Sequence, residues 1–327
     1  MPTVAPEKIL KQLAELWVTT AKEATEESGH GVLRACSMTL VVVAEHSDDV
    51  SALGETLAAL MPEHPARAIV VRLTGNGGRD LSDRVYAQCW MPFGQRRQIC
   101  CEQVEIVASD DALGDLPSVV LPLAVPDLPL ILWCRGARVL RVPEFPPLAE
   151  MATRIVMDSA GFGEPGTAFQ WLQAAVSRRQ PLVGDLAWTH LTRWREMLAL
   201  IFENRRNVEH LSGPVRIRVC DGGQVTTRAL YLAAWLKDGI ESMGMQAAVS
   251  ALRETETFVE LAGGGFSARL ERQDERLVTT VNGQSQCTNL PAPTDYRFMR
   301  EELGIMRRDA VFEKTLASAA RLAYATE

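Results

Sequence analysis

The sequence predicts an α/β protein of two domains, each a mixed sheet packed with helices, with α+β character in the C-terminal part. Three observations support this prediction. Strand-like apolar runs alternate with helical patterns in the first half, a glycine-rich stretch at Gly161–Gly166 interrupts the chain, and two hairpin patterns precede two closing helices. The 327 residues are enough to build two hydrophobic cores.

The N-terminal half begins with a helix at Pro6–Thr25, where Ile9, Leu13 and Trp17 share one stripe and the charged residues lie mostly off it. The next element, Val32–Ala44, shows little alternation of polar and apolar residues, which is typical of a central strand. The same patterns predict a helix at Asp48–Met61 and strands at Ala66–Leu73, Arg84–Trp90, Gln98–Ala108 and Ala152–Met157.

An apolar segment with three prolines, Leu121–Trp133, lies between these strands. Proline fixes φ and removes a backbone donor, so the first part of the segment is not expected to be a regular strand or helix interior. We predict a buried irregular connection that becomes a short strand from Leu130. Asp127 is the one charged residue in it, and burying that carboxylate would be costly unless it is paired.

The stretch Gly161–Gly166 is the predicted domain boundary, giving domains at residues 1–163 and 164–327. The sequence after it predicts helices at Phe169–Ser177, Leu191–Phe202 and Leu230–Met243 and a strand at Val215–Val219. The C-terminal third predicts a hairpin around Gly263–Gly265, a type I′ hairpin at Asn282–Gly283, and helices at Tyr296–Leu303 and Asp309–Tyr324.

Composition excludes several classes of protein. A net charge of −7 and the lack of any basic block argue against a nucleic-acid partner. The N-terminus has no apolar signal core and no run is long enough to span a bilayer, so we expect a soluble cytoplasmic protein without a membrane partner. Seven cysteines, an odd number at wide spacing, are expected to be free thiols.

The motifs that would indicate an enzyme are missing from the sequence. It contains no phosphate loop, no Gly-x-Gly-x-x-Gly at a helix start, no His-Glu-x-x-His, no Cys-x-x-Cys and no Gly-x-Ser-x-Gly. Gly75–Gly78 connects two predicted strands and is better interpreted as a turn than as a phosphate cradle. We therefore predict no catalytic residue, no cofactor and no metal site.

The adjacent pair Cys100-Cys101 leaves two interpretations open. Neighbouring strand residues face opposite sides of a sheet and cannot readily form a disulfide, which favours buried thiols. A redox-responsive thiol would require exposure and a lowered pKa.

Several stretches between Arg34 and Glu313 combine into a more specific pattern. They are Arg34-Ala-Cys36-Ser-Met38-Thr39-Leu40, His64-Pro65-Ala66-Arg67, Gln98-Ile99-Cys100-Cys101-Glu102-Gln103, Val125-Pro126-Asp127-Leu128-Pro129 with Trp133, Met157-Asp158-Ser159, Gly184-Asp185-Leu186-Ala187-Trp188, Leu191-Thr192-Arg193-Trp194-Arg195-Glu196, Glu302-Leu303 and Asp309-Ala310-Val311-Phe312-Glu313. In this order they resemble the glucose-6-phosphate dehydrogenase assembly protein family, OpcA, of cyanobacteria and actinobacteria. The chain departs from that family at Arg193, where proline is usual, and at Cys134, where a second tryptophan is frequent.

The resemblance implies a non-catalytic protein that binds glucose-6-phosphate dehydrogenase and promotes its active oligomer or alters its response to substrate and redox state, in the oxidative pentose phosphate pathway. The family has no assigned catalytic residues, in agreement with the motif search. Two alternatives stay open: a sugar-phosphate-binding enzyme of the same pathway, such as a lactonase, and a scaffold for several pathway enzymes. Whether a metabolite binds is undetermined by the sequence.

Candidate partner-binding residues are polar or aromatic side chains near strand ends and loops, where a docking surface could use them as anchors. The alternative is core packing for the two tryptophans and a salt-bridge or capping role for Arg34, His64 and Arg67. For Asp127 and for Asp158-Ser159 it is buried hydrogen bonding to loop backbone. They are Arg34, His64, Arg67, Asp127, Asp158, Ser159, Trp188, Trp194 and Arg195.

Overall fold

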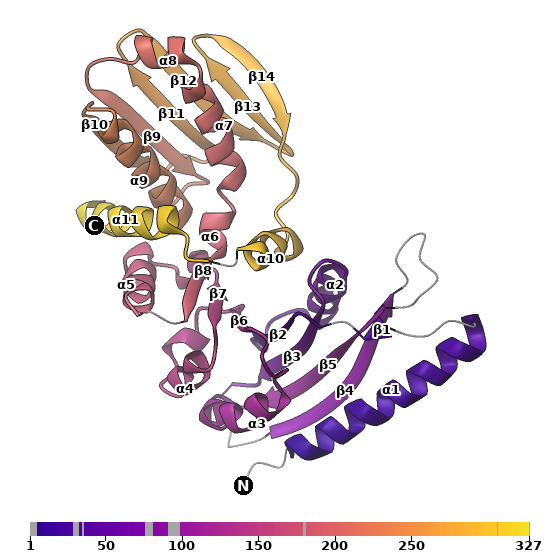
Figure 1. The fold of residues 1–327 in the computed structure, drawn as a ribbon. Coiled ribbons are helices and arrows are strands. Elements are labelled where there is room, and N and C mark those ends of the chain that lie inside the picture. Colours follow the sequence, from indigo (N-terminus) through magenta and orange to yellow (C-terminus); the bar gives the residue numbers. More distant parts are fainter. Residues whose placement is uncertain are drawn as a thin grey trace. The chain divides into compact units, whose positions relative to one another are not determined.

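The computed structural model describes residues 5–28, 33–34, 36–75, 81–90, 99–178, 181–305 and 307–326. Side chains are described over 5–19, 36–75, 81–85, 102–178, 181–305 and 307–324. The chain forms two compact units, drawn in Figure 1. Unit 1 comprises residues 1–158, 178–184 and 295–306, and unit 2 comprises residues 159–177, 185–294 and 307–327. The division is therefore discontinuous in sequence, because a late segment of the chain returns to unit 1.

The sheet of unit 1 is mostly parallel. Its strand order is β4–β5–β3–β2–β6–β7–β8, with β1 paired to the start of β5 and β4 antiparallel to β5. The strands are β1 Leu33–Arg34, β2 Met38–Ala44, β3 Ala66–Leu73, β4 Leu81–Trp90, β5 Ile99–Ala108, β6 Leu130–Cys134, β7 Arg154–Met157 and β8 Leu182–Asp185. Every residue of β2 is buried, which explains why the sequence there does not alternate. The predicted mixed sheet is confirmed.

The helices of unit 1 cover this sheet and include one from the C-terminal third of the chain. They are α1 Pro6–Ser28, α2 Val50–Leu60, α3 Leu116–Leu123, α4 Phe145–Glu150 and α10 Asp295–Gly304, with short 3-10 turns at Asp110–Asp115 and Val139–Arg141. Helix α2 begins at the N-cap Asp49, whose carboxylate accepts from the Ser51 and Ala52 N–H groups. Figure 1 shows α1 running along β4 at the sheet edge.

An exposed cluster connects α10 to the residues that follow α2. The Arg300 Nε donates to Glu63 at 2.6 Å, and the Tyr296 hydroxyl donates to the same carboxylate at 3.2 Å. These hydrogen bonds, the Arg300 one foremost, lower the pKa of Glu63 below its ordinary value of 4.5. Because the folded-state pKa is depressed, the stabilisation is present above about pH 4.5 and is lost as the pH falls through the folded value.

Replacing Arg300 by alanine is therefore expected to raise the pKa of Glu63 towards 4.5. The change removes the hydrogen bond that lowers this pKa most. A carboxyl-detected NMR titration of Glu63 checks this. Tyr296→Phe is the graded control and should raise the same pKa by less. An unchanged Glu63 titration in Arg300→Ala would contradict the assignment.

The proline segment differs from its prediction. Leu121–Leu123 form the end of α3, with Pro122 inside the helix, and Leu121 is 52% exposed. Pro122 lies in the last turn of α3, where its missing N–H removes one intrahelical bond, and the helix ends one residue later at Leu123. Asp127 is not buried either: it is exposed, in the left-handed region at φ 63°. The predicted buried irregular connection is thus wrong: Leu121–Leu123 are helical, and none of residues 124–129 is buried. The strand from Leu130 is confirmed as β6.

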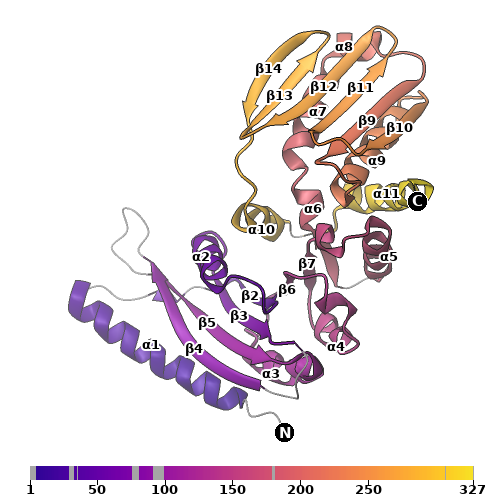
Figure 2. The same cartoon turned by 180° about the vertical axis from the view of Figure 1, so that it is seen from behind.

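Unit 2 is built on a second sheet of order β10–β9–β11–β12–β13–β14, seen from behind in Figure 2. The strands are β9 Val215–Asp221, β10 Ala247–Leu252, β11 Thr257–Gly263, β12 Phe266–Gln273, β13 Arg276–Val281 and β14 Gln284–Asn289. Strands β9 and β10 are parallel and joined by a helical crossover; the remaining pairs are antiparallel. Asn282 and Gly283 have φ of 50° and 83°, which confirms the predicted tight turn between β13 and β14.

The helices of unit 2 are α5 Pro165–Val176, α6 Leu186–Thr189, α7 Thr192–Glu203, α8 Arg205–His210, α9 Thr227–Ser242 and α11 Ala310–Thr326, with a 3-10 turn at Ser159–Phe162. Helix α9 packs on β9 and β10, and α11 packs on α9 and α5. An aromatic core centred on buried Tyr231 holds them together: its ring lies 5.0 Å from Phe169, 5.7 Å from Trp188 and 6.0 Å from Phe312.

None of the helices in the described ranges combines the length and the apolar character that a bilayer crossing requires.

Candidate functional site

The β9–α9–β10 crossover places the end of β9 beside the first turn of α9. The carboxyl ends of parallel strands are where α/β sheets most often bind ligands. Asp221 is the last residue of β9, and Thr226 caps α9 by accepting from the Ala229 N–H at 3.1 Å. The Asp221 carboxylate accepts from the Thr226 hydroxyl at 2.6 Å and from the Arg228 Nε at 3.0 Å. Strand end and helix start are thereby fixed to each other.

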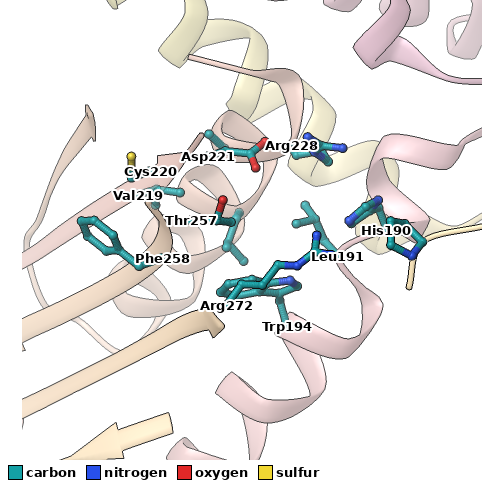
Figure 3. Close-up of a pocket in the computed structure, with 13 residues that line it drawn as sticks. His190, Leu191, Trp194, Val219, Cys220, Asp221, Arg228, Thr257, Phe258 and Arg272 are labelled. Atoms are coloured by element: carbon teal, nitrogen blue, oxygen red, sulfur yellow. Dashed lines mark hydrogen bonds and ion pairs between the residues drawn. The ribbon is translucent and has the colours of Figure 1, made fainter. Parts of the chain in front are cut away.

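A pocket of about 120 Å³ opens at this point within unit 2. It is lined by side chains of β9, α9, the start of β11, the end of β12 and the α6–α7 turn, as Figure 3 shows. The volume is sufficient for several water molecules but below the range of about 300–1,000 Å³ that drug-sized ligands occupy. The arrangement therefore suits a small ligand.

The lining combines positive charge with apolar walls. Arg228 comes from α9 and Arg272 from the end of β12, and His190 lies next to them at one end of the pocket in Figure 3. The one carboxylate in the lining, Asp221, is already paired with Arg228. The apolar walls are contributed by Leu191, Trp194, Val219, Leu232, Phe258 and Pro293.

The lining also contains a thiol and a carboxylate whose hydrogen-bond partners lie within unit 2. Its one thiol, Cys220, is buried and donates to the Glu254 carbonyl at 2.9 Å, which is a backbone acceptor and not a base. Across the described residues, no group of three or more His, Cys, Asp or Glu side chains could hold a metal ion.

The predicted candidate residues of unit 1 divide by burial. Arg67 is buried on β3: it pairs with Glu102 and donates from Nη1 to the Leu123 carbonyl at 2.5 Å. Glu102 also accepts from the Trp17 Nε1 at 2.6 Å, so Arg67 connects β3, β5, α3 and α1 internally. This supports the salt-bridge alternative for Arg67 over a surface role.

The other unit 1 candidates are less enclosed. His64 is half-buried after α2, Asp158 is half-buried after β7, and Asp127 is exposed in its turn. Arg34 lies on β1 with its side chain outside the described ones. Cys100 and Cys101 lie on β5, and their side chains also fall outside the described set. Their roles stay predictions.

The candidates of unit 2 are mostly interior. Trp188 is 3% exposed; its Nε1 donates to Asp309 at 3.2 Å and the Arg195 guanidinium lies 3.6 Å from its ring centroid. Trp194 is buried as well, and forms a wall of the pocket. Ser159 is buried and donates its N–H to Asp185 at 2.9 Å. The packing alternative is thus favoured for both tryptophans, while Arg195 is half-exposed.

Four cysteines have described side chains. Cys134 and Cys220 are buried, Cys36 is half-buried and Cys287 is exposed, and all four are free thiols. Burial raises the pKa of the Cys134 thiol strongly, which keeps it protonated and unreactive.

Comparison with protein families covers most of the chain. Residues 58–174 match the glucose-6-phosphate dehydrogenase subunit N-terminal domain, and residues 181–316 match the C-terminal domain of the same subunit. The chain belongs to the OpcA family. Its resemblance to that family, expected from the sequence, is confirmed.

Curated relatives carry the same family name. A protein named OxPP cycle protein OpcA from Synechocystis sp. is 28% identical over 156 residues, which cover 47% of this chain and 32% of the relative. One from Nostoc punctiforme is 26% identical over 167 residues, covering 50% and 36%. The matched region therefore spans about a third of the length of these OpcA relatives.

Solved structures of similar architecture are more distant. An NAD binding oxidoreductase from Klebsiella pneumoniae gives a TM-score of 0.49 at 9% identity, with 89% of this chain and 96% of that one covered. KijD10, a 3-ketoreductase from Actinomadura kijaniata, gives 0.44 at 10% identity, with 90% and 97% covered. These values are too low to carry any activity or cofactor over to this OpcA family member.

The pocket of this OpcA family member was not predicted from the sequence. Arg228 and Arg272 stand far apart in sequence and meet only because β12 lies two strands from β9. A local signal was present: Asp221-Gly222-Gly223 ends a strand and Thr226 starts a helix, a spacing typical of a crossover site.

Proposed function

We propose that this chain is a non-catalytic partner of glucose-6-phosphate dehydrogenase, an assembly factor and allosteric effector that promotes the active oligomer of that enzyme in the oxidative pentose phosphate pathway. The observation that carries the proposal is the pair of family matches, one for each half of the chain. The pocket lining, which pairs its thiol with a backbone carbonyl and its carboxylate with Arg228, supports the non-catalytic part. The same role places the chain in the cytoplasm with that enzyme.

Contacts with the dehydrogenase are proposed at candidate side chains that reach the surface. His64, Asp127, Asp158 and Arg195 are exposed or half-exposed and fit this role. Arg67, Ser159, Trp188 and Trp194 are all buried, and a docked partner would reach them only after rearrangement.

Mixing the purified chain with its cognate glucose-6-phosphate dehydrogenase is expected to produce a larger species and to change the enzyme's response to glucose 6-phosphate. Light scattering after size exclusion and initial-rate measurements, each with and without reductant, check both effects. If two folded proteins show no common species and an unchanged substrate response, the proposal is wrong.

A matched pair of variants localises the contact. Asp127 and Asp274 are both exposed aspartates in the left-handed region, with φ of 63° and 54°, in different units. Asparagine tolerates that conformation, so each change removes a charge without backbone strain. Asp127→Asn should weaken association several-fold and Asp274→Asn should leave it unchanged; the reverse order would move the contact from the Asp127 turn to the turn between β12 and β13.

A further inference from the structure

The pocket at the end of β9 presents two guanidinium groups whose terminal nitrogens are available. Arg228 donates from Nε to Asp221 at 3.0 Å, and Arg272 donates from Nε to the Asp274 carbonyl at 3.1 Å. Within the described part of the chain these are the only hydrogen bonds of either guanidinium. A guanidinium has five N–H donors, so the outer fork of each, Nη1 and Nη2, stays unoccupied while the inner Nε fixes its position.

Such forks have a preferred ligand. Two parallel N–H donors match the two oxygens of a carboxylate or phosphate in a bidentate, charge-assisted contact. Arg228 and Arg272 contribute two positive charges to the lining, Asp221 contributes one negative charge, and the balance of this trio is positive. A neutral or cationic ligand would leave that balance uncompensated in a partly enclosed space.

The apolar walls restrict the ligand further. Trp194 is buried, with 5% of its surface exposed, and forms one side of the pocket; Leu191 and Pro293 are also in the lining. Figure 3 shows the Arg272 side chain extending along Trp194 towards the end where Arg228 and His190 lie. An oxyanion held at that end would leave the remainder of a small molecule against the indole.

We propose that this pocket is a binding site for a small organic anion, with the Arg228 and Arg272 forks holding the oxyanion and Trp194 covering the organic part. No step of covalent chemistry is involved. The site lies wholly within unit 2 and needs no dehydrogenase to bind its ligand, so it can be tested on the isolated chain.

Isothermal titration of the full chain with phenyl phosphate, benzoate and phenol tests the proposal. We expect saturable binding of one or both anions and none of phenol; the stronger anion identifies whether phosphate or carboxylate is preferred. Absence of saturable binding of both anions up to about 10 mM, or equal binding of phenol, would overturn the site.

Variants distinguish anion binding in the pocket from nonspecific attraction of the anion to surface charge. Arg272→Ala should weaken the binding of the anion about tenfold or more. Arg272→Lys keeps the charge but not the two parallel N–H donors, so it should recover only part of the lost affinity. Arg276→Ala is the matched control, because Arg276 is exposed on the paired strand β13 and outside the pocket lining. Equal losses of anion affinity in Arg272→Ala and Arg276→Ala would refute the assignment of the anion to this pocket.

A third variant is expected to bind the anion more tightly than the wild type does. Asp221→Asn keeps an oxygen acceptor for Arg228 and Thr226 but removes the one negative charge of the lining, so the anion should bind several-fold more tightly. Each variant is accepted only with an unchanged circular dichroism spectrum. Unchanged or weaker anion binding in a folded Asp221→Asn variant would place the anion elsewhere.

Discussion

Replacing Glu302 by alanine is expected to lower the free energy of unfolding of unit 1 by about 3–5 kcal/mol. Glu302 lies on α10 and pairs with Arg154 of β7, and their side chains are only 2% and 8% exposed. Arg154 also donates from Nη1 to the Ile305 carbonyl at 2.6 Å. Removing the carboxylate would leave a buried guanidinium without its counter-charge, and an unpaired buried ion costs more than the pair itself contributes.

The backbone of Gly184 packs directly against this ion pair. A Cβ at that position would lie 2.2 Å from the Glu302 Oε2 and 2.9 Å from the Arg154 Nη2, closer than any side chain can approach. Glycine at 184 is thus required by the ion pair, which gives a physical reason for the first residue of the Gly184-Asp185 stretch. Gly184→Ala should destabilise the same region in the same direction.

Urea unfolding followed by amide hydrogen exchange in β7 and α10 measures the effect where it occurs. Arg300→Ala is the matched control on the same helix: its ion pair with Glu63 is exposed, so the midpoint should change far less. The double variant Arg154→Met with Glu302→Leu should recover much of the loss, because an apolar pair needs no desolvated charge. Equal midpoints for Glu302→Ala and the wild type would show that the pair is not buried in solution.

Local patterns determined what the sequence could predict. The continuous apolar run of β2 and the Asn282-Gly283 turn depend on neighbouring residues only, and both were predicted correctly. The Arg154–Glu302 pair joins residues 148 apart, and the pocket joins Arg228 to Arg272 through sheet order. No local pattern encodes such contacts. The Asp221-Gly222-Gly223 turn before Thr226 indicates the crossover alone, and the return of α10 to unit 1 and the approach of Arg272 to the pocket became visible only in the folded structure.

Aromatic residues were ambiguous for a related reason. Trp188 and Trp194 lie next to arginines in the sequence, which is typical of a docking surface as well as of a packed core. The structure buries both, because Trp188 packs on Tyr231 and Phe312 from two other helices. Exposure is a tertiary property, and sequence neighbours alone did not determine it.

The buried carboxyl of Asp185 connects three segments of unit 2. It is fully enclosed, at 0% exposure. Its Oδ1 accepts from the Ser159 N–H at 2.9 Å and, as the N-cap of α6, from the Ala187 N–H at 3.0 Å. Its Oδ2 accepts from the Tyr231 hydroxyl at 2.8 Å. The 3-10 turn at Ser159, helix α6 and helix α9 therefore share one acceptor group.

Asp185→Ala is expected to lower the free energy of unfolding of unit 2 by about 3–4 kcal/mol, since it leaves three buried donors without an acceptor. Asp185→Asn is the matched control: its carbonyl oxygen still accepts from both N–H groups and its amide can donate to the Tyr231 oxygen, so the loss should be about 1 kcal/mol. Tyr231→Phe should cost about 1–2 kcal/mol, and its effect should largely vanish in the Asp185→Ala background because the shared hydrogen bond is already gone. Chemical denaturation of the wild type, Asp185→Ala, Tyr231→Phe and the double variant closes this double-mutant cycle. Additive losses for Asp185→Ala and Tyr231→Phe would show that the two side chains do not bond to each other, and the account of Asp185 as the common acceptor of unit 2 would be wrong.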